Sequence, residues 1–346
     1  MEWIKKITLT SFRNYSDREF IFHPGINLIH GENGIGKSNL LESLLITSIG
    51  RSNRTNNLKE AISHGASSFY IKVFYTKEGL SEKIQVNFDG TSKEILHNHT
   101  RHKSFSSLLG LIPSVVYSPS DVDIITGEPF HRRKFMDIHL AQSDPVYTLH
   151  LSRYNKALKH RNFLLKSNNM EAIEIWEEQL AASAQIIQKK REQFIHELEE
   201  IFTSEFSHFH HKSKVPKVIY KPSPKTSITQ ESYKESRAKD QLFGFTTIGP
   251  HRDDLTFSLD KERAKLFSSE GEKRLLVIAL KLASYKMMGA IIFAMDDYLS
   301  YLDENKQKHL IKRLEMLPQV FLTAPSNTTC PLIHSISITA ANGAVC

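Results

Sequence analysis

Residues 31–38 read Gly31-Glu32-Asn33-Gly34-Ile35-Gly36-Lys37-Ser38. This stretch fits the phosphate-binding pattern G-x-x-x-x-G-K-[ST] at every position. The strand-like residues 26–29 precede it, and residues 38–49 follow with an apolar face at helical spacing and Gly50 as a stop. A strand, a glycine loop and a helix in this order predict a P-loop. The alternative, a chance glycine-rich turn, does not account for this context.

Each residue type in this motif has a task in binding ATP. The glycines permit positive φ, so the backbone N–H groups of residues 31–36 can surround the β-phosphate at the start of a helix. Lys37 is expected to reach the β- and γ-phosphates and to act in catalysis. Ser38 is expected to supply a hydroxyl ligand to Mg²⁺.

A P-loop also needs a carboxylate at the end of a neighbouring strand. Residues 291–297 read Ile-Ile-Phe-Ala-Met-Asp-Asp, a short apolar strand that ends in two acidic residues. Asp296 is expected to hold Mg²⁺ through water, and Asp297 to orient the attacking water at the γ-phosphate. Such a pair also occurs as a simple cap or turn, but together with the P-loop it indicates a nucleotide site.

The composition is that of a globular protein. The chain has 346 residues, of which 40% are hydrophobic and 24% charged, which excludes a disordered chain, a collagen and a coiled-coil rod. Its most apolar stretch, residues 275–295, is interrupted by Lys281 and Lys286, so it predicts no membrane span. The N-terminus lacks the pattern of a signal peptide, and two cysteines, Cys330 and Cys346, fit a reducing compartment. We therefore expect a cytoplasmic protein and assign the cysteines no chemistry.

The periodicity along the chain predicts an α/β domain that is divided in the sequence by a helical insertion. We expect an N-terminal part over residues 1–117, a helical arm over 118–240 and a C-terminal part over 241–346. Two helical segments, 132–166 and 170–206, should form an antiparallel hairpin, with a break at Asp144-Pro145. Residues 212–240 are rich in Lys, Ser, Pro and Gln and predict a loop-rich connection, in which Val218-Ile219-Tyr220 is the only strand-like segment. The other elements expected are strands at 7–9, 20–22, 26–29, 69–75, 84–88, 291–295 and 320–323, and helices at 275–288 and 305–316.

Positive charge favours a polyanionic partner. The chain has 45 Lys and Arg against 38 Asp and Glu, a net charge of +7, and nucleic acid is the first candidate. Residues 132–166 contain only Asp137 and Asp144 as acids, and we call this segment the basic arm. Its basic residues are Arg132, Arg133, Lys134, Arg153, Lys156, Lys159, Arg161 and Lys166. The alternative for this arm is a solvated helix face; as a DNA surface, it would contact phosphates without reading sequence.

Three further groups have competing interpretations. Ser269, in a Ser-Glu-Gly segment before a helix, is either an anion site or an ordinary N-cap. The histidines at 208, 210 and 211 are more simply a solvated helix end than a metal site. Asp253 and Asp254 favour a structural role over a catalytic one, because no substrate-pocket motif accompanies them.

The order of these motifs resembles that of the ATPase heads of the SMC and ABC type, and most of all the bacterial RecF family. The resemblance rests on Phe12-Arg13-Asn14-Tyr15, the P-loop, residues 50–55, Ser118-Pro119-Ser120-Asp121, residues 132–137 and Gly249-Pro250-His251-Arg252-Asp253-Asp254. It covers about residues 4 to 325. It implies a P-loop NTPase of the ABC/SMC head type with an inserted helical domain.

The resemblance also implies the function. Members of the family bind duplex or gapped DNA in an ATP-dependent manner, form head-to-head homodimers, hydrolyse ATP slowly and work with RecO and RecR in DNA repair, replication and the SOS response. By the same resemblance Arg13 lies near the nucleotide, and Ser269 and Gly271 complete the ATP site of the opposite subunit. Ser300-Tyr301-Leu302-Asp303 matches the loop at the dimer interface. The implied cofactors are ATP and Mg²⁺.

The sequence departs from the family pattern at three places. Glu270 and Glu272 stand where glutamine is usual, Asp297 stands where a longer glutamate is common, and no histidine follows the strand at residues 320–323. These departures favour a switch with modest hydrolysis. Two alternatives remain open at this point: the ATP-binding subunit of an ABC transporter, and a P-loop kinase that phosphorylates a small molecule.

Overall fold

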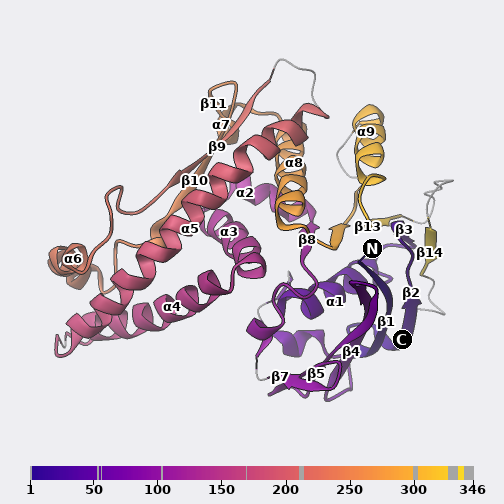
Figure 1. Cartoon of the computed structure of the whole chain (residues 1–346), viewed down its shortest axis with the longest axis horizontal. Coiled ribbons are helices and arrows are strands. Elements are labelled where there is room, and N and C mark those ends of the chain that lie inside the picture. Colours follow the sequence, from indigo (N-terminus) through magenta and orange to yellow (C-terminus); the bar gives the residue numbers. More distant parts are fainter. Residues whose placement is uncertain are drawn as a thin grey trace. The chain divides into compact units, whose positions relative to one another are not determined.

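The computed structural model describes residues 2–52, 54–55, 57–102, 104–168, 170–209, 214–298, 303–325 and 334–338. Its contacts divide the chain into two compact units (Figure 1). The first consists of Met1–Ser120 and Met288–Cys346, and the second is Asp121–Met287. This division groups residues 241–287 with the helical unit, whereas the sequence-based division places them in the ATPase head. The domain boundaries expected from the sequence stay a prediction.

A six-stranded antiparallel sheet forms one layer of the first unit. Its strands are, in spatial order, β2 (Tyr15–Ile21), β1 (Trp3–Phe12), β4 (Phe69–Lys77), β5 (Leu80–Phe88), β6 (Lys93–His97) and β7 (Thr100–His102). Side chains alternate between its two faces, as period-2 patterning requires. Ile7 and Leu9 are fully buried whereas Thr8 between them is partly exposed.

A five-stranded parallel sheet forms the other layer of this unit. Its strands are, in order, β14 (His334–Ser337), β3 (Gly25–His30), β13 (Gln319–Ala324), β12 (Ile292–Met295) and β8 (Ser114–Tyr117). Every residue of β12 and β13 is buried, which explains the apolar sequence of β12 and of residues 320–322 in β13. Helix α1 (Lys37–Ile49) places Leu40, Leu41 and Leu44 in one core with both sheets. Because β3, β12 and β13 are parallel, their carboxyl ends meet at one edge.

The second unit is mainly helical. Its helices are α2 (Asp123–Thr126), α3 (Pro129–Ser143), α4 (Pro145–Lys166), α5 (Ile173–Ser207), α6 (Gln230–Phe243), α7 (Ala264–Phe267) and α8 (Glu270–Met288), with α9 (Glu304–Leu314) in the first unit. A small antiparallel sheet has the order β11 (Glu262–Arg263), β10 (Asp254–Leu259) and β9 (Pro216–Lys221).

The expected helical hairpin is confirmed in α4 and α5. Asp144 accepts hydrogen bonds from the N–H groups of Val146 and Tyr147, and Pro145 occupies the first turn, so the chain stops α3 and restarts as α4. The pairing is antiparallel: Tyr147, early in α4, contacts Arg191, in the middle of α5. At the other end the rings of His160 and Trp176 stack 4.2 Å apart.

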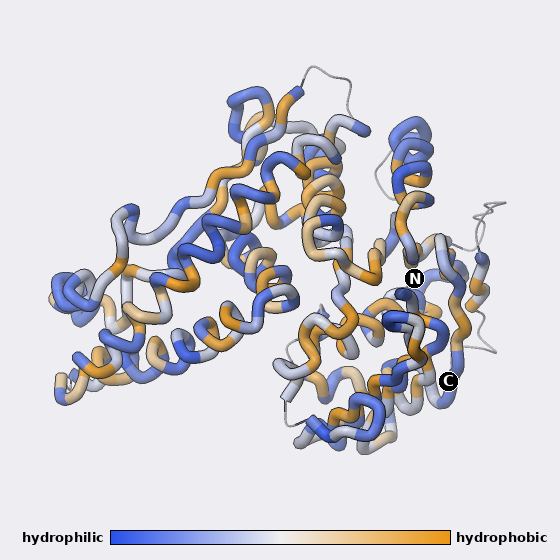
Figure 2. Tube along the Cα trace, in the orientation of Figure 1, coloured by the Kyte–Doolittle hydropathy of each residue, from blue (hydrophilic) through white to orange (hydrophobic). Residues whose placement is uncertain are grey.

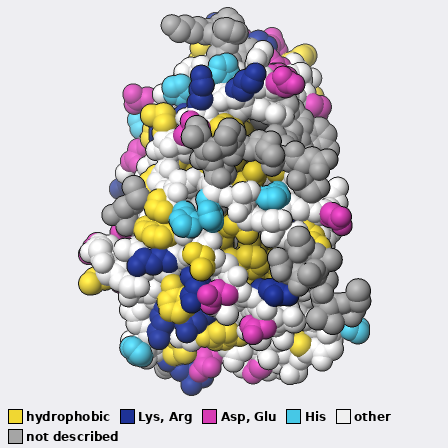
Figure 3. Space-filling view, turned by 90° about the vertical axis from the view of Figure 1, so that its right-hand side faces the viewer, with side chains coloured by type: hydrophobic (Ala, Val, Ile, Leu, Met, Phe, Trp, Pro, Cys, Tyr) yellow, Lys and Arg dark blue, Asp and Glu magenta, His cyan; other side chains and the backbone are white. Residues whose placement is uncertain are grey.

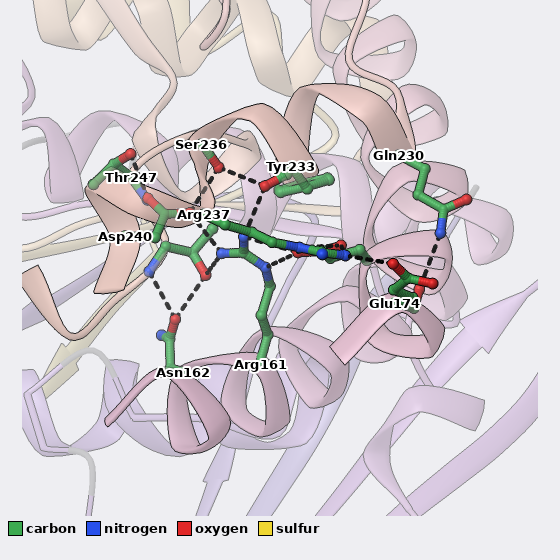
Figure 4. A network of polar contacts seen from close by, with 11 residues as sticks. Arg161, Asn162, Glu174, Gln230, Tyr233, Ser236, Arg237, Asp240 and Thr247 are labelled. Atoms are coloured by element: carbon green, nitrogen blue, oxygen red, sulfur yellow. Dashed lines mark hydrogen bonds and ion pairs between the residues drawn. The ribbon is translucent and has the colours of Figure 1, made fainter. Parts of the chain in front are cut away.

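The expectation of a loop-rich connection over residues 212–240 is wrong at helix α6, whereas its strand-like segment, residues 218–220, lies in strand β9. Strand β9 and helix α6 occupy much of this segment, and a capping box between Thr229 and Ser232 starts the helix. Helix α6 has only two buried residues, Tyr233 and Asp240, so it lacks the apolar periodicity that sequence analysis detects. Figure 4 shows what holds it instead, a network of polar contacts around Arg161.

Arg161 is completely buried and pairs with two buried carboxylates. Its guanidinium lies 2.6 Å from the Asp240 Oδ2 of α6 and 3.1 Å from the Glu177 Oε1 of α5. It also donates to the Thr246 hydroxyl and the Tyr233 carbonyl. The network therefore ties α4, α5 and α6 together through charge and hydrogen bonds.

Helix α8 has a long buried run in its middle, and orange residues are frequent along it in Figure 2. Residues 275–285 are all buried, including Lys281, which pairs with Asp121 at 3.2 Å. Among the described residues, no helix is both long and apolar enough to cross a membrane.

Candidate nucleotide site

The glycine loop between β3 and α1 adopts the backbone that a P-loop requires. Gly34 and Gly36 have φ of 83° and 114°, in the region that favours glycine. A Cβ atom at Gly36 would lie 2.7 Å from the Asn14 amide and 2.9 Å from the Tyr15 hydroxyl, so any other residue would displace these side chains. Asn14 donates to the Ile35 carbonyl at 2.7 Å, and the Tyr15 hydroxyl to the Gly36 carbonyl at 2.9 Å. Asn14 and Tyr15, which follow β1, thus hold the backbone of the glycine loop in place.

Lys37 folds back over this loop. Its Nζ donates to the carbonyls of Gly31 and Glu32, each at 2.8 Å. Partial burial lowers the pKa of the Lys37 ammonium, and the carboxylates of Asp296 and Asp297 counteract this effect. A cation in this position faces two acidic groups and is well placed to receive phosphate oxygens.

The predicted partners on the two strands come together. The Ser38 hydroxyl donates to the Asp296 Oδ1 at 2.9 Å, although 258 residues separate them in the sequence. The Thr323 hydroxyl, at the end of β13, donates to the same oxygen at 2.7 Å. Thr323 also accepts the N–H of Asp297 at 2.7 Å, and Asp297 has a φ of 52°. Thr323 therefore positions both aspartates, a role that sequence analysis missed.

These residues line a pocket of about 610 Å³. The P-loop contributes one wall, and Asp296, Asp297 and Thr323 contribute another. Arg54, with its side chain half exposed, also lines the pocket and donates to the Asn39 Oδ1 at 2.5 Å. Arg54 lies in the quoted segment 50–55, but the sequence offers no reason to choose it over Arg51.

Arg13 pairs with a buried glutamate of α1. Its guanidinium forms two hydrogen bonds, of 2.9 and 2.6 Å, with the carboxylate of Glu42, which is fully buried in α1. A third bond reaches the Glu60 carbonyl. Arg13 is not among the residues that line the pocket. The structure gives it the task of neutralising Glu42, and a direct role at the nucleotide stays a prediction.

Ser269 and Gly271 stand at the start of α8, in the second unit. The N–H of Ser269 donates to the Glu272 Oε2 at 2.8 Å, and the N–H of Glu272 donates to the Ser269 Oγ at 3.3 Å. This reciprocal pair is a helix cap, as the simpler interpretation of Ser269 requires. Whether Ser269 and Gly271 also complete the ATP site of a second molecule stays a prediction.

The two glutamates that depart from the family pattern are both paired. Lys214 contacts the Glu272 carboxylate at 2.5 Å. Burial raises the pKa of Glu272, but the Lys214 ammonium and the Ser269 backbone outweigh it and lower the pKa to about 2. Glu270 contacts Lys273 at 2.8 Å. Part of their negative charge is therefore balanced within the chain.

Only part of the basic arm is available to a partner. Arg132 pairs with Asp254 at 2.5 Å, Arg133 donates to the Asp253 carbonyl, and Arg161 is buried. We expected an exposed cationic face with Arg153, Lys156, Lys159 and Arg161, and this is wrong for Arg161, which pairs with two buried carboxylates. The exposed cations of α4 are Arg153, Lys156, Lys159 and Lys166.

The remaining candidates divide between structural roles and undescribed segments. Asp253 is fully buried, pairs with Arg191 at 2.8 Å and accepts hydrogen bonds from Gln188 and the Ser223 N–H, so its predicted structural role is confirmed. Asp303 caps α9 through the Lys306 N–H at 2.9 Å. Several predicted residues lie outside the described residues: Ser300, Tyr301, Leu302, His210, His211, Cys330 and Cys346. In the described part of the chain, no group of three or more potential ligands is arranged for a metal ion.

The fold and this pocket define a class of protein. A P-loop, a buried parallel sheet, an aspartate pair at the adjacent strand end and a helical unit between the two parts of the first unit characterise the nucleotide-binding heads of ABC and SMC proteins. The family model of the RecF/RecN/SMC N terminal domain matches residues 3–342. The chain belongs to this family and, within it, to the RecF proteins.

Individual relatives support this assignment. The chain is 33% identical over 334 residues to the DNA replication and repair protein RecF of Protochlamydia amoebophila, covering 92% of this chain and 93% of the relative. It is 35% identical over 330 residues to that of Clostridium novyi, with 90% of each covered. The similarity of these relatives favours the RecF interpretation over the transporter subunit.

Solved structures agree with the sequence comparison. The structure of the recombination mediator protein RecF with ATP in the RecFOR pathway superposes with a TM-score of 0.88 and 28% identity, covering 97% of this chain and 95% of that one. An Smc head bound to the C-winged helix domain of ScpA gives a TM-score of 0.60 at 16% identity, covering 99% and 95%. The second likeness concerns the fold alone.

Proposed function

We propose that this chain is an ATP-controlled DNA-binding protein of recombinational repair and replication restart. The observation that carries the proposal is the contact between Ser38 and Asp296, which joins the P-loop to the carboxylate of a second strand at one pocket. The names of its RecF relatives and of the RecF structure with ATP support the same function.

ATP and Mg²⁺ suit the chemistry of this pocket. The loop at residues 31–36 and the Lys37 ammonium supply donors and positive charge for the phosphates. The Ser38 hydroxyl and the Asp296 carboxylate supply hard oxygen ligands, of the kind that Mg²⁺ prefers. Mg²⁺ would neutralise phosphate charge, and Asp296 would hold it through water. Arg54 adds a second cation at the rim.

Hydrolysis should be slow. Asp297 is the candidate for orienting the attacking water, and its short side chain reaches less far than a glutamate. Ala324 and Pro325 follow Thr323 in the lining of the pocket, so no histidine stands there to contact the γ-phosphate. Modest turnover suits a switch whose ATP-bound state persists on DNA.

The remaining parts of the proposal concern partners. ATP would join two molecules, with Ser269 and Gly271 of one facing the nucleotide of the other. The pathway named for the structural relatives supports RecO and RecR as partners. The place of action would be the cytoplasm. Duplex or gapped DNA would contact the exposed cations of α4 through its phosphates, without sequence preference.

The direct test is the substitution Lys37→Met. It removes the cation that contacts the phosphates and should reduce ATP affinity at least about 100-fold, since a charge-assisted contact of this kind contributes on the order of 3 kcal/mol or more. ATP should then no longer strengthen DNA binding. Fluorescent nucleotide titration and DNA anisotropy measure the two effects.

Lys59→Met is the matched control, because Lys59 is an exposed lysine of the same unit outside the pocket. It should leave both properties unchanged. A Lys37→Met protein that still binds DNA more tightly with ATP refutes the proposal. A small-molecule kinase would also bind ATP, so stimulation of ATP turnover by DNA, rather than by a metabolite, separates the two functions.

A further inference from the structure

Large apolar side chains gather, exposed, at the end of the hairpin in the second unit. Phe163, in the last turn of α4, is 68% exposed, and Phe243, at the end of α6, is 53% exposed. Phe243 lies 5.8 Å from the ring of Phe245, whose face carries the Arg252 guanidinium at 4.8 Å. Such side chains are costly to leave in water, so a cluster of them marks an interaction site.

A stacked pair extends this surface along α4. The rings of His160 and Trp176 are nearly parallel, 7° apart, with centroids separated by 4.2 Å. His160 precedes Phe163 by three residues, which places both on the outward side of the helix. On the other flank of α4, a Cβ atom placed at Gly244 would lie 3.6 Å from the Lys166 Cγ. The end of α6, where Gly244 separates Phe243 from Phe245, therefore lies beside α4.

Cations lie between these rings. Lys159 lies four residues before Phe163, and Lys166 lies three residues after it. Both lysines are exposed. No ion pair of theirs is found among the described residues, in contrast to Arg161 on the inner side of the helix. Helix α4 contains no Asp or Glu over its 22 residues. The surface therefore combines ring faces with positive charge that its own helix does not neutralise.

We infer that this surface, formed by His160, Phe163, Trp176 and Phe243 with Lys159 and Lys166, binds single-stranded DNA by stacking unpaired bases. The inference rests on the proposed function in taking DNA as the partner, and it adds a site separate from the ATP pocket. Ring faces interleaved with lysines are the arrangement that holds unpaired bases and their phosphates without reading sequence.

Duplex DNA makes no use of the rings, because its bases are stacked inside the helix and only its backbone meets a protein surface of this kind. An apolar protein partner would use the rings but would not require the lysines. Single-stranded DNA is the occupant that satisfies both. The chain would then have a means of recognising the unpaired segment beside a duplex.

The fluorescence of Trp176 reports on this site. Trp3 and Trp176 are the two tryptophans of the sequence, so Trp3→Phe leaves Trp176 alone. In that background, an oligothymidylate should quench the emission by stacking near the indole, whereas a blunt duplex of equal charge should not. The double substitution Phe163→Ser and Phe243→Ser should lower oligothymidylate affinity at least tenfold, since each stacked base contributes about 1–3 kcal/mol.

Phe130→Ser is the matched control, because Phe130 is a phenylalanine of the same unit that is 58% exposed at the start of α3. It should leave affinity and quenching intact. The double variant should retain its circular dichroism and its ATP-dependent duplex binding. If the folded double variant binds oligothymidylate as tightly as the parent protein does, the inference is overturned. This holds also if the surface is found to bind a protein.

The same experiment separates the two proposals. In Lys37→Met, quenching by oligothymidylate should persist although control by ATP is lost. If the parent protein shows quenching without any effect of ATP on duplex binding, the proposed function fails while this site stands. If ATP controls duplex binding but oligothymidylate neither quenches nor depends on Phe163 and Phe243, this inference fails alone.

Discussion

Thr323 positions both aspartates of the pocket through its hydroxyl group. Its hydroxyl donates to the Asp296 carboxylate and accepts the backbone N–H of Asp297, so a single oxygen fixes both acidic residues. The Asp297 backbone is left-handed at φ 52°, a conformation that needs support in a non-glycine residue. The position of the water-orienting carboxylate therefore depends on Thr323.

The substitution Thr323→Val tests this dependence. It keeps the shape of the side chain but removes both hydrogen bonds, and we expect ATP turnover to fall about tenfold or more, because a hydrogen bond to a charged group contributes about 1.5–3 kcal/mol. ATP affinity should change less than turnover, since Lys37 and the loop remain. Single-turnover kinetics and nucleotide titration distinguish the two effects.

Thr76→Val is the matched control for this substitution. Thr76 is a threonine on β4 of the same unit, and its buried hydroxyl has no hydrogen-bond partner among the described residues. Its loss should leave turnover unchanged and should not reduce stability. Equal ATP turnover in Thr323→Val and the parent protein would contradict the role of Thr323 in positioning Asp297.

The residues that sequence analysis found are those fixed by a spaced motif. Lys37, Ser38 and Asp296 are identified by the P-loop and by the end of an apolar strand, and the structure brings them together. Thr323 and Arg54 belong to no spacing rule, because their positions depend on which strands and loops become neighbours. The pairing of Arg13 with the buried Glu42 could not be foreseen, because in the sequence Glu42 resembles any other helical glutamate.

At the scale of elements, the buried charges of the helical unit replace apolar packing. Arg161 faces Glu177 and Asp240, and Arg237 reaches Glu177 at 2.6 Å (Figure 4). Breaking a buried pair costs far more than its net contribution to folding, because the remaining partners keep their charge without compensation. The attachment of α6 to the hairpin should therefore be sensitive to a single change.

Arg161→Met provides the test. It leaves Glu177 and Asp240 buried with less compensation, and the free energy of unfolding should fall by about 3–5 kcal/mol. Arg153→Met, at an exposed position of the same helix, should change it by less than about 0.5 kcal/mol. Urea titration of both proteins gives the comparison. Similar stabilities would contradict the structural role assigned to Arg161.

The same chemistry explains which elements could be predicted. The strands at 69–75 and 84–88 and the break at Asp144-Pro145 follow from apolar periodicity and capping, and all are confirmed. Helix α6 was missed because charge, rather than an apolar face, holds it. The basic arm was overestimated for the same reason, since composition does not tell an arginine in solvent from one in the core.

At the scale of the whole molecule, buried histidines set a limit on acid stability. Burial, with a contribution from the Lys281 ammonium, lowers the pKa of His139 to about 3. Burial likewise lowers the pKa of His251 to about 4, and this histidine bridges Tyr154 and the Thr246 carbonyl. Both rings are neutral in the folded protein at pH values where an unfolded chain would protonate them.

The consequence is a loss of stability in mild acid. The unfolded chain binds these protons near pH 6.5, whereas the folded protein resists them until about pH 4. The free energy of unfolding is therefore unaffected by these histidines above pH 6.5. Below that pH it falls by about 1.4 kcal/mol per pH unit for each histidine. Denaturant titrations between pH 7 and pH 4.5 measure the slope.

Substitution identifies the groups responsible. His139→Phe combined with His251→Asn should flatten the slope between pH 6 and pH 4.5 relative to the parent protein. His196→Gln, at an exposed position of α5, should leave it as it is. A double variant with the slope of the parent protein would assign the acid sensitivity to other groups.

The distribution of charged side chains over the surface is a second property at this scale. Figure 3 shows Lys and Arg side chains beside hydrophobic ones low on one face, with acidic side chains among them. Mixed surfaces of this kind bind polyanions only weakly, because the acids offset the cations. The exposed side of α4, which has no acids, is the better candidate for DNA.

Whether ATP controls DNA binding is best decided by measuring DNA affinity with and without Mg-ATP over a salt series, with the molecular mass followed in parallel. We expect ATP, but not ADP, to produce a dimer and to strengthen binding to duplex or gapped DNA. The logarithm of the affinity should fall by about 0.9 per phosphate contact for each tenfold rise in salt. If ATP binds the pocket while neither mass nor DNA affinity changes, the claim that ATP controls DNA binding is contradicted.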